Sequence, residues 1–390
     1  KKPTSVGFFI VGDSVHYQLI QTQNELNTFV EQIKNKPILA IDTEFMRRRT
    51  LYPEVALIQV YDGEHLALID PLAELSLFDF WQILKDPKVL KVLHSPSEDI
   101  EVFQKYAGFV PYPLFDTQFA LQLLGEGNCM GFALMVKTLL NIEIDKSESR
   151  TNWLQRPLTQ KQLEYAAADT YHLLPCFELI IDSIKAADLF DIVINESELV
   201  ANKRAFQIPD ELLYKEIKNA WQLKPHELAV LKELAVWRRN KAIRKNLALN
   251  FVLKEHNMTE IAKRGPSSLN ALRQIPGVEP IEVNRSGVEI LKCIEQAKAI
   301  PAEQHPQVLK RLIDFPTYKK VAKEIKQKIT KVAKEHNIPE DVMASKKQIN
   351  QLISWNWKLT AQQKEKHIKP DLLSSWRYDF VKDALKEWDN

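Results

Sequence analysis

The sequence predicts a mixed α/β domain followed by an entirely helical region. Strand-like and helix-like segments alternate in the first half, strand signals are nearly absent after Glu211, and the charge changes sign between the halves. Residues 1–200 contain 17 Lys and Arg against 28 Asp and Glu, whereas residues 201–390 contain 36 against 23. The net charges are therefore −11 and +13. A basic half attracts polyanions, and an acidic half repels them unless its carboxylates hold metal ions.

Apolar runs of strand length alternate in the first half with segments of helical spacing. We expect strands at Val15–Ile20, Pro37–Phe45, Val55–Tyr61, His65–Ile69 and Val89–Leu93. We expect helices at Asn24–Asn35, Leu77–Lys85, Pro96–Tyr106, Thr117–Leu124, Phe132–Leu140 and Thr159–Lys185. Asp62-Gly63 is a hairpin signal between two of the strands. The alternation predicts a mixed sheet with helices on its faces, ending near residue 195.

Short helices separated by Gly and Pro are expected in the second half. They are predicted at Pro225–Asn246, Asn250–His256, Thr259–Arg264, Ser267–Gln274 and Arg285–Lys298. The pentapeptide Lys254–Met258 is echoed 80 residues later by Lys334–Ile338. Chance similarity of two basic segments is the alternative, but a repeat favours two copies of a small helical domain. We therefore expect domains at 1–200, 210–298 and 303–390.

The composition excludes several classes of protein. Hydrophobic residues make up 45% and charged residues 27% of the chain, as in ordinary globular proteins. No apolar run is long enough to span a membrane, so we expect no membrane partner. Cys129, Cys176 and Cys293 lie far apart, which argues against a zinc site or a disulfide framework and favours a reducing cytoplasm. We expect a monomer.

Two carboxylates stand at the end of the first buried strand. Asp42 and Glu44 follow the apolar run Ile38–Ile41 and are two residues apart, so they point to the same face of a strand. Two converging carboxylates are unfavourable at a sheet centre unless divalent cations compensate them. A solvated strand end is the alternative interpretation.

Two further acids and a tyrosine occupy related places. Asp99 follows the strand at 89–93, where it is either a favourable charge near a helix N-terminus or part of a cleft at the strand ends. Tyr165 and Asp169 are four residues apart on a predicted helix, so the phenol and the carboxylate share one face. An ordinary half-buried tyrosine beside an exposed aspartate is the alternative there.

Taken in order, these motifs resemble a known nuclease family. Asp42-x-Glu44, Asp99 after a strand and Tyr165-x-x-x-Asp169 resemble the three exonuclease motifs of the DEDD superfamily, and the tyrosine is typical of its DEDDy branch. The segments Leu57-Ile58-Gln59-Val60 and His94-x-x-x-Glu98-Asp99 are similar to those of bacterial ribonuclease D. The helical repeats resemble the tandem HRDC (helicase and RNase D C-terminal) domains of that family, so the resemblance covers nearly the whole chain.

The resemblance implies a ribonuclease H-like fold and a 3′→5′ exoribonuclease with two divalent metal ions, Mg²⁺ or Mn²⁺. Asp42, Glu44, Asp99 and Asp169 would supply the oxygen ligands. Tyr165 would orient the attacking water. The products would be nucleoside 5′-monophosphates, and the substrates tRNA precursors and other structured RNA with 3′ extensions. A DNA 3′→5′ exonuclease and a non-catalytic RNA-binding scaffold are the alternatives; the intact acids and tyrosine argue against the scaffold.

Residues beside the first motif are candidates for substrate contacts. Phe45 is expected either to stack on a base or to pack in the core, and Arg47, Arg48 and Arg49 either to bind phosphates or to form a solvated loop. His94 is interpreted as a hydrogen-bonded core histidine, and Asp116 as a helix cap.

Basic and aromatic residues also alternate in the helical half, where they would bind RNA by phosphate contact and stacking. They are Trp237, Arg238, Arg239, Lys241, Arg244 and Lys245, and later Trp355, Trp357, Trp376, Arg377 and Tyr378. Packing in the cores of small domains is the stronger interpretation for each tryptophan. The net charge of +13 is the firmer evidence for RNA binding.

Overall fold

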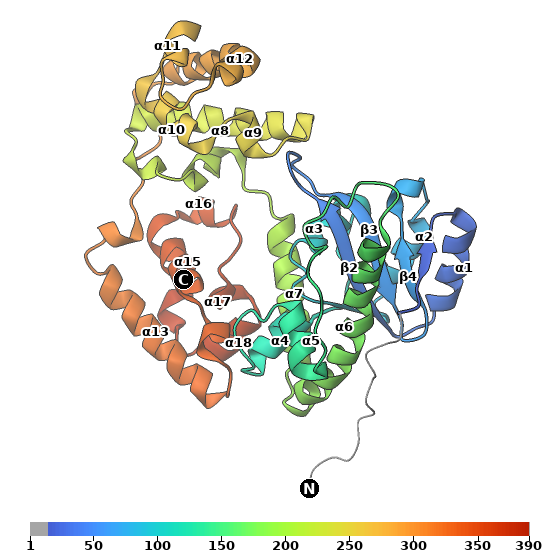
Figure 1. Cartoon of the computed structure of the whole chain (residues 1–390). Helices are drawn as coiled ribbons and strands as arrows, with labels where there is room; N and C mark the ends of the chain where they lie inside the picture. The colour runs from blue at the N-terminus through green and yellow to red at the C-terminus, as the bar shows by residue number, and fades with distance from the viewer. Residues whose placement is uncertain (1–14, 390) are drawn as a thin grey trace. The chain divides into compact units, whose positions relative to one another are not determined.

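The computed structural model describes residues 15–389, which form two compact units. One unit ends at Glu198, and the other begins at Leu199 and also includes the loop Arg47–Glu54 (Figure 1). Within residues 15–389, none of the helices combines the length and the apolar character that a membrane crossing needs.

A six-stranded mixed sheet forms the centre of the first unit, with the order β1-β4-β3-β2-β5-β6. Its strands are β1 Gln18–Ile20, β2 Ile38–Met46, β3 Glu54–Tyr61, β4 Leu66–Ile69, β5 Leu90–Leu93 and β6 Leu114–Asp116. The pairs β1–β4, β2–β5 and β5–β6 are parallel, and the hairpin β3–β4 is antiparallel. The predicted mixed sheet is confirmed. The strand β6 was not predicted, because three residues are too few to show an alternating pattern.

Helices on the faces of this sheet complete the first unit (Figure 1). They are α1 Gln23–Ile33, α2 Phe78–Lys85, α3 Asp99–Tyr106, α4 Thr117–Leu123, α5 Phe132–Leu140 and α6 Gln160–Ala186. Helix α3 begins at Asp99 rather than at Pro96. The first unit ends at Glu198, close to the predicted end near residue 195, and this boundary lies inside the next helix, α7 Phe190–Ala205.

Two apolar clusters show to which face of the sheet each side chain of the central strand β2 points. Leu39 and Ile41 of β2 pack into a core with residues of α1, α2 and α3. A second cluster contains Ala166 and Ala167 of α6 together with Trp153. Because side chains alternate along a strand, the even-numbered residues of β2 face the side opposite to Leu39 and Ile41. This alternation sets the direction of the two carboxylates of β2.

The second unit is helical throughout its described residues after α7. Its α-helices are α8 Pro225–Lys245, α9 Leu249–Val252, α10 Glu255–Arg264, α11 Leu269–Arg273, α12 Pro280–Lys298, α13 Tyr318–Glu335, α14 Glu340–Met343, α15 Lys346–Lys358, α16 Ala361–Lys364, α17 Asp371–Ser374 and α18 Trp376–Val381. The expected helix at 250–256 is wrong, because Leu253 adopts an extended conformation that separates α9 from α10. Helix α12 starts five residues before the predicted Arg285, with Pro280 in its first turn.

The helical half does repeat, but not in the register that the pentapeptides predict. The first pentapeptide lies at the start of α10, whereas the second lies at the end of α13. The equivalent short helices are α9 and α14, which begin at residues 249 and 340, and each is followed by a longer helix that begins at residue 255 or 346. Equivalent helices of the two copies are therefore 91 residues apart. The pentapeptides, 80 residues apart, lie in helices that are not equivalent.

One ion pair ties the end of β4 to the segment that leads into α6. The guanidinium of Arg156 donates two hydrogen bonds of 2.7 Å to the carboxylate of Asp70, and others to the carbonyl oxygens of Ala56 and Trp153. The side chain of Asp70 is only 3% exposed. Burial raises the pKa of this carboxyl, but the hydrogen bonds from Arg156, Gln21 and the Leu72 amide, together with the charge of Arg156, lower the pKa overall. Asp70 therefore remains charged and needs its partner.

We expect Arg156→Ala to lower the free energy of unfolding of the first unit by about 3–5 kcal/mol, because it leaves a buried carboxylate unpaired. The control is Lys137→Ala, which removes one partner of the exposed Lys137–Glu143 pair and should change the stability little. Urea denaturation measures both. Equal, small effects would show that the Asp70–Arg156 pair does not stabilise the fold.

Candidate active site

Three carboxylates gather on the side of β2 that faces α6. Asp42 and Glu44 come from β2 and Asp169 comes from α6, and one carboxylate oxygen of each lies within 4.8 Å of the others. Asp42 and Glu44 are half-buried and Asp169 is buried. Close carboxylate oxygens are the ligands that Mg²⁺ and Mn²⁺ prefer, so this group fits a divalent metal ion.

Helix α6 reaches the sheet because of its small residues and its cap. Thr159 caps the helix and forms a reciprocal capping box with Gln162. Ala166 and Ala167 are completely buried, which allows the helix backbone to approach the sheet closely. Tyr165 lies one turn before Asp169 and its hydroxyl donates a hydrogen bond to the Asp169 carboxylate. The predicted Tyr–Asp pair on one helix face is thus present.

The fourth acid lies beside this group. Asp99 is the first residue of α3, is 7% exposed, and accepts a hydrogen bond of 2.5 Å from the hydroxyl of Thr43. It does not belong to the three carboxylates within 4.8 Å, but its charge contributes to raising the pKa of Asp42 and of Glu44. The structure therefore brings all four predicted acids into one electrostatic environment.

The end of β6 holds the turn that carries Asp99. Ser95 has the left-handed backbone angle φ = 59°, and its amide donates a hydrogen bond of 2.9 Å to the carboxylate of Asp116. The ring of His94 bonds to the hydroxyl of Thr117 at 2.9 Å and to a backbone carbonyl at 3.0 Å. Asp116 also caps α4, as expected. These contacts fix the path of the chain between β5 and Asp99, a role that sequence reasoning did not assign.

Burial and mutual repulsion make the four acids hard to ionise. Burial, followed by repulsion from the other acids, raises the pKa of Asp42 well above its ordinary value and that of Glu44 to about 9. Burial raises the pKa of Asp99 to about 6 and that of Asp169 to about 7, while the bond from Tyr165 opposes the shift at Asp169. Bound cations would reverse this balance by stabilising the ionised carboxylates.

The phenol of Tyr165 stays protonated at neutral pH. Burial and the negative charges of Asp169, Glu44 and Asp42 raise its pKa above the ordinary value near 10. Its ring packs against Trp153 with the ring centres 6.0 Å apart. Tyr165 is therefore a positioned hydrogen-bond donor and not a base.

The predicted substrate contacts lie in two environments. Phe45 is half-buried and packs against the core formed with α1, α2 and α3. Arg47, Arg48 and Arg49 are exposed and belong to the loop of the second unit. In that loop, the carbonyl of Arg49 accepts a 2.7 Å hydrogen bond from the amide of Ala248. Their contacts with substrate stay a prediction.

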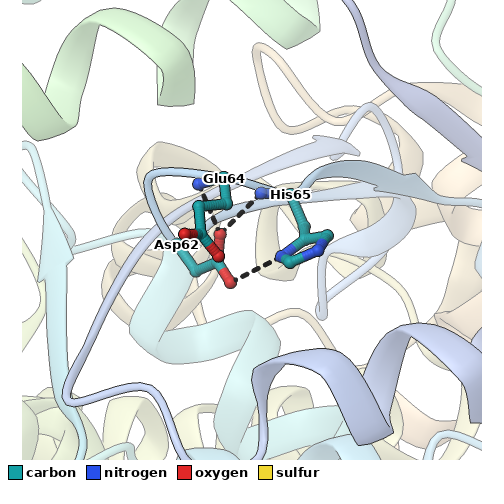
Figure 2. A group of neighbouring side chains, drawn as sticks. All are labelled: Asp62, Glu64 and His65. Atoms are coloured by element: carbon teal, nitrogen blue, oxygen red, sulfur yellow. Dashed lines mark hydrogen bonds and ion pairs between the residues drawn. The ribbon is translucent and has the colours of Figure 1, made fainter.

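A second acidic group, at the β3–β4 hairpin, was not predicted as a site. Figure 2 shows Asp62, Glu64 and His65, which are grouped closely enough to suggest a metal site. The carboxylate of Asp62, however, already accepts hydrogen bonds from the backbone amides of Glu64 and His65 at 2.7 and 2.6 Å, and bonds to the His65 ring at 3.0 Å. The ammonium of Lys36 lies 3.4 Å from it. These contacts stabilise the turn and leave no role for an ion.

The α/β half and the helical half of the chain each match known protein families. Residues 17–185 match the 3′-5′ exonuclease family, residues 227–294 the HRDC domain, and residues 316–385 the C-terminal HRDC domain of ribonuclease D. The exonuclease match contains all four acids and Tyr165.

Full-length relatives give the same result. Ribonuclease D of Escherichia coli is 41% identical over 371 residues, which is 95% of this chain and 98% of the relative. That of Cronobacter turicensis is 41% identical over 94% of this chain and 98% of its own length. The crystal structure of Escherichia coli RNase D, described as an exoribonuclease involved in structured RNA processing, matches with a TM-score of 0.89 over 96% of this chain and 98% of that chain. The ribonuclease H-like exonuclease and HRDC architecture is therefore confirmed, and the chain belongs to the ribonuclease D family of 3′→5′ exoribonucleases.

Proposed function

We propose that this exoribonuclease hydrolyses RNA 3′ ends with two divalent metal ions and releases nucleoside 5′-monophosphates. The main support is the group formed by Asp42, Glu44 and Asp169, whose oxygens lie within 4.8 Å of one another. With Asp99 beside them, four acids share a region where burial and repulsion disfavour their charges. When bound, Mg²⁺ or Mn²⁺ would activate a water and stabilise the leaving oxygen of a phosphodiester.

The position of each acid suggests its role. Asp42 belongs to the group with Glu44 and Asp169, and after burial the charge of Asp99 contributes most to raising its pKa. Asp42 would therefore be suited to contact both ions. Glu44 and Asp169 would share one ion with it. Asp99, held by Thr43 at the edge of the group, would help to hold the other.

Tyr165 would orient the attacking water. Its hydroxyl already donates a hydrogen bond to Asp169, which is one of the proposed ligands. Because the phenol keeps its one proton, it can turn this proton from Asp169 to the oxygen of a water, or accept a hydrogen bond from the water, but it cannot remove a proton from it. The activation of the water therefore belongs to the metal ions and their carboxylates.

We further propose that the substrates are structured RNAs with 3′ extensions, tRNA precursors among them. The relative from Escherichia coli, 41% identical, is described as an enzyme of structured RNA processing. The chain also joins a half of net charge −11 to a half of +13, which separates catalysis from attraction of the polyanion. Phe45 and Arg47–Arg49 are proposed contacts for the 3′ end.

We expect chelation of divalent cations to abolish hydrolysis of a 3′-extended tRNA, and Mg²⁺ or Mn²⁺ to restore it. Asp42→Asn and Asp169→Asn should each reduce the release of nucleoside 5′-monophosphates to near background, because each removes a proposed ligand. The control is Glu64→Gln in the second acidic group, which removes an exposed charge and should leave the rate unchanged.

The release of nucleoside 5′-monophosphates is measured by chromatography of the products. A DNA of matched sequence serves as the second substrate. Full activity of either Asn variant would exclude the two-metal assignment. Equal hydrolysis of RNA and DNA would exclude the assignment to RNA alone.

We expect Tyr165→Phe to lower kcat by about 10²–10⁴-fold, because it removes the hydroxyl but keeps the ring that packs on Trp153. The affinity for Mn²⁺ should persist, since no carboxylate is lost. Tyr171→Phe, a half-buried tyrosine on the same helix, is the control and should keep the wild-type rate. Single-turnover kinetics with calorimetry measure both quantities. An unchanged rate for Tyr165→Phe would show that this side chain only packs.

A further inference from the structure

Helix α13 carries an unusual density of lysines. Seven lysines lie in its 18 residues, against two acids, Glu324 and Glu335. The lysines are Lys319, Lys320, Lys323, Lys326, Lys328, Lys331 and Lys334. The helix therefore carries a net charge of +5, out of +13 for the helical half.

The apolar residues of α13 set the direction of these lysines. Ile325, Ile329 and Val332 are buried and recur with helical spacing, so they define the face that packs into the domain. Every lysine of the helix except Lys328 is exposed. At 100° per residue, four of the exposed lysines lie opposite to the buried residues, and two lie on one flank of that side. The four are Lys320, Lys323, Lys331 and Lys334, and the two are Lys319 and Lys326. We call these six exposed lysines the lysine face of α13.

Most of this face has no ionic partner in the protein. Within the part of the chain that the structure describes, Lys319, Lys323, Lys326 and Lys334 form no ion pair. The pairs of the other two are long, at 3.9 Å from Lys320 to Glu324 and 3.8 Å from Lys331 to Glu335. Like charges three and four residues apart repel one another on a helix, so the face does not stabilise the domain by itself.

The basic helix that the sequence singles out in the first helical domain behaves differently. In α8, Arg238 is 5% exposed and bonds to the carbonyl of Leu253. Lys241 pairs with Glu289 at 2.6 Å, and the indole of Trp237 donates to the same carboxylate at 2.8 Å. Arg239 pairs with Asp210. Trp237, Arg238, Arg239 and Lys241 thus stabilise their own domain. Arg244 and Lys245 of the same helix are exposed, and the binding of RNA by this helix stays a prediction.

Trp376 and Arg377 in α18 are also internal. Trp376 is 6% and Arg377 3% exposed, and the guanidinium of Arg377 donates a 3.0 Å hydrogen bond to the carbonyl of Val342. Aromatic stacking on RNA is therefore not available to this pair. The lysine face of α13, by contrast, is a group of six exposed cations, of which Lys319, Lys323, Lys326 and Lys334 form no ion pair within residues 15–389.

We infer that the lysine face of α13 binds the phosphate backbone of the structured part of the RNA, and this rests on the proposed function. The catalytic unit is acidic and repels a long polyanion, so affinity for the body of the RNA must come from another surface. Unpaired lysines on one helix face are complementary to a row of phosphates. Neutralising phosphates releases their counterions, which supplies binding free energy without sequence specificity.

The test is the salt dependence of binding to a 3′-extended tRNA by the full chain. The variant is Lys319→Gln, Lys323→Gln and Lys326→Gln combined. The control removes three exposed lysines of the first unit, Lys85, Lys88 and Lys185, by the same substitution. A second version replaces the three α13 lysines by Arg and keeps the charge. Circular dichroism checks that all four proteins are folded.

We expect the α13 Gln variant to bind more weakly, with a log–log salt slope that is smaller by about 0.7–0.9 for each lost phosphate contact. The Lys85, Lys88 and Lys185 variant and the Arg variant should retain the wild-type slope. An unchanged slope in the α13 Gln variant, or an equal loss in the control, would overturn the inference. Hydrolysis of a short single-stranded RNA by the wild-type chain reports the proposed function separately.

Discussion

The crowding of four carboxylates in a buried place is the constraint on which the exonuclease unit depends. Asp42, Glu44, Asp99 and Asp169 repel one another where water screens them poorly, so the isolated site opposes folding when it is ionised. The surrounding residues must hold them together against this repulsion. The alternation of β2 directs two of them, the buried alanines of α6 bring a third, and the turn fixed by β6 brings the fourth. The grouping of the four acids is unfavourable without cations and would become favourable when cations bind. The stability of the fold and the proposed metal chemistry therefore depend on the same residues.

The same electrostatics explains the division of the chain. A unit of many acids is suited to hold metal ions but not to attract a long polyanion. The helical half supplies the opposite charge, and its cations have two separate uses. Arg238, Arg239 and Lys241 of α8 form ion pairs or buried hydrogen bonds that stabilise the domain, whereas four of the six exposed lysines of α13 form no ion pair within residues 15–389. Counting charges in the sequence shows the excess of +13, but only the contacts show which cations are free to bind RNA.

How much the sequence predicts depends on the range of each interaction. Local signals succeed: the hairpin at Asp62-Gly63 and the spacings of Asp42 with Glu44 and of Tyr165 with Asp169 are all present in the structure. Signals that depend on a partner far along the chain fail. The three-residue strand β6 exists only because β5 pairs with it, and the role of Asp116 depends on a turn 21 residues earlier.

The repeat shows the same limit in another form. The matching pentapeptides are similar in composition, yet one begins a helix and the other ends one. The structural repeat pairs α9 with α14 and α10 with α15, whose sequences share little more than the apolar residues that pack inward. Core packing constrains the shape and the burial of side chains, and many different sequences meet these constraints. A local identity between two short basic segments carries no such information.

The thermal stability of the metal-free protein tests the central claim most directly. The melting temperatures of the wild type and of Asp42→Asn are compared in chelator and in Mn²⁺. We expect Asp42→Asn to melt at a higher temperature than the wild type in chelator at neutral pH. The Asp42 carboxyl is ionised in the unfolded chain and must on folding either take up a proton or stay charged beside the other acids, and the amide avoids both costs. Mn²⁺ should raise the melting temperature of the wild type and much less that of the variant. A variant that is less stable in chelator and gains as much from Mn²⁺ as the wild type would show that repulsion relieved by cations does not govern this site.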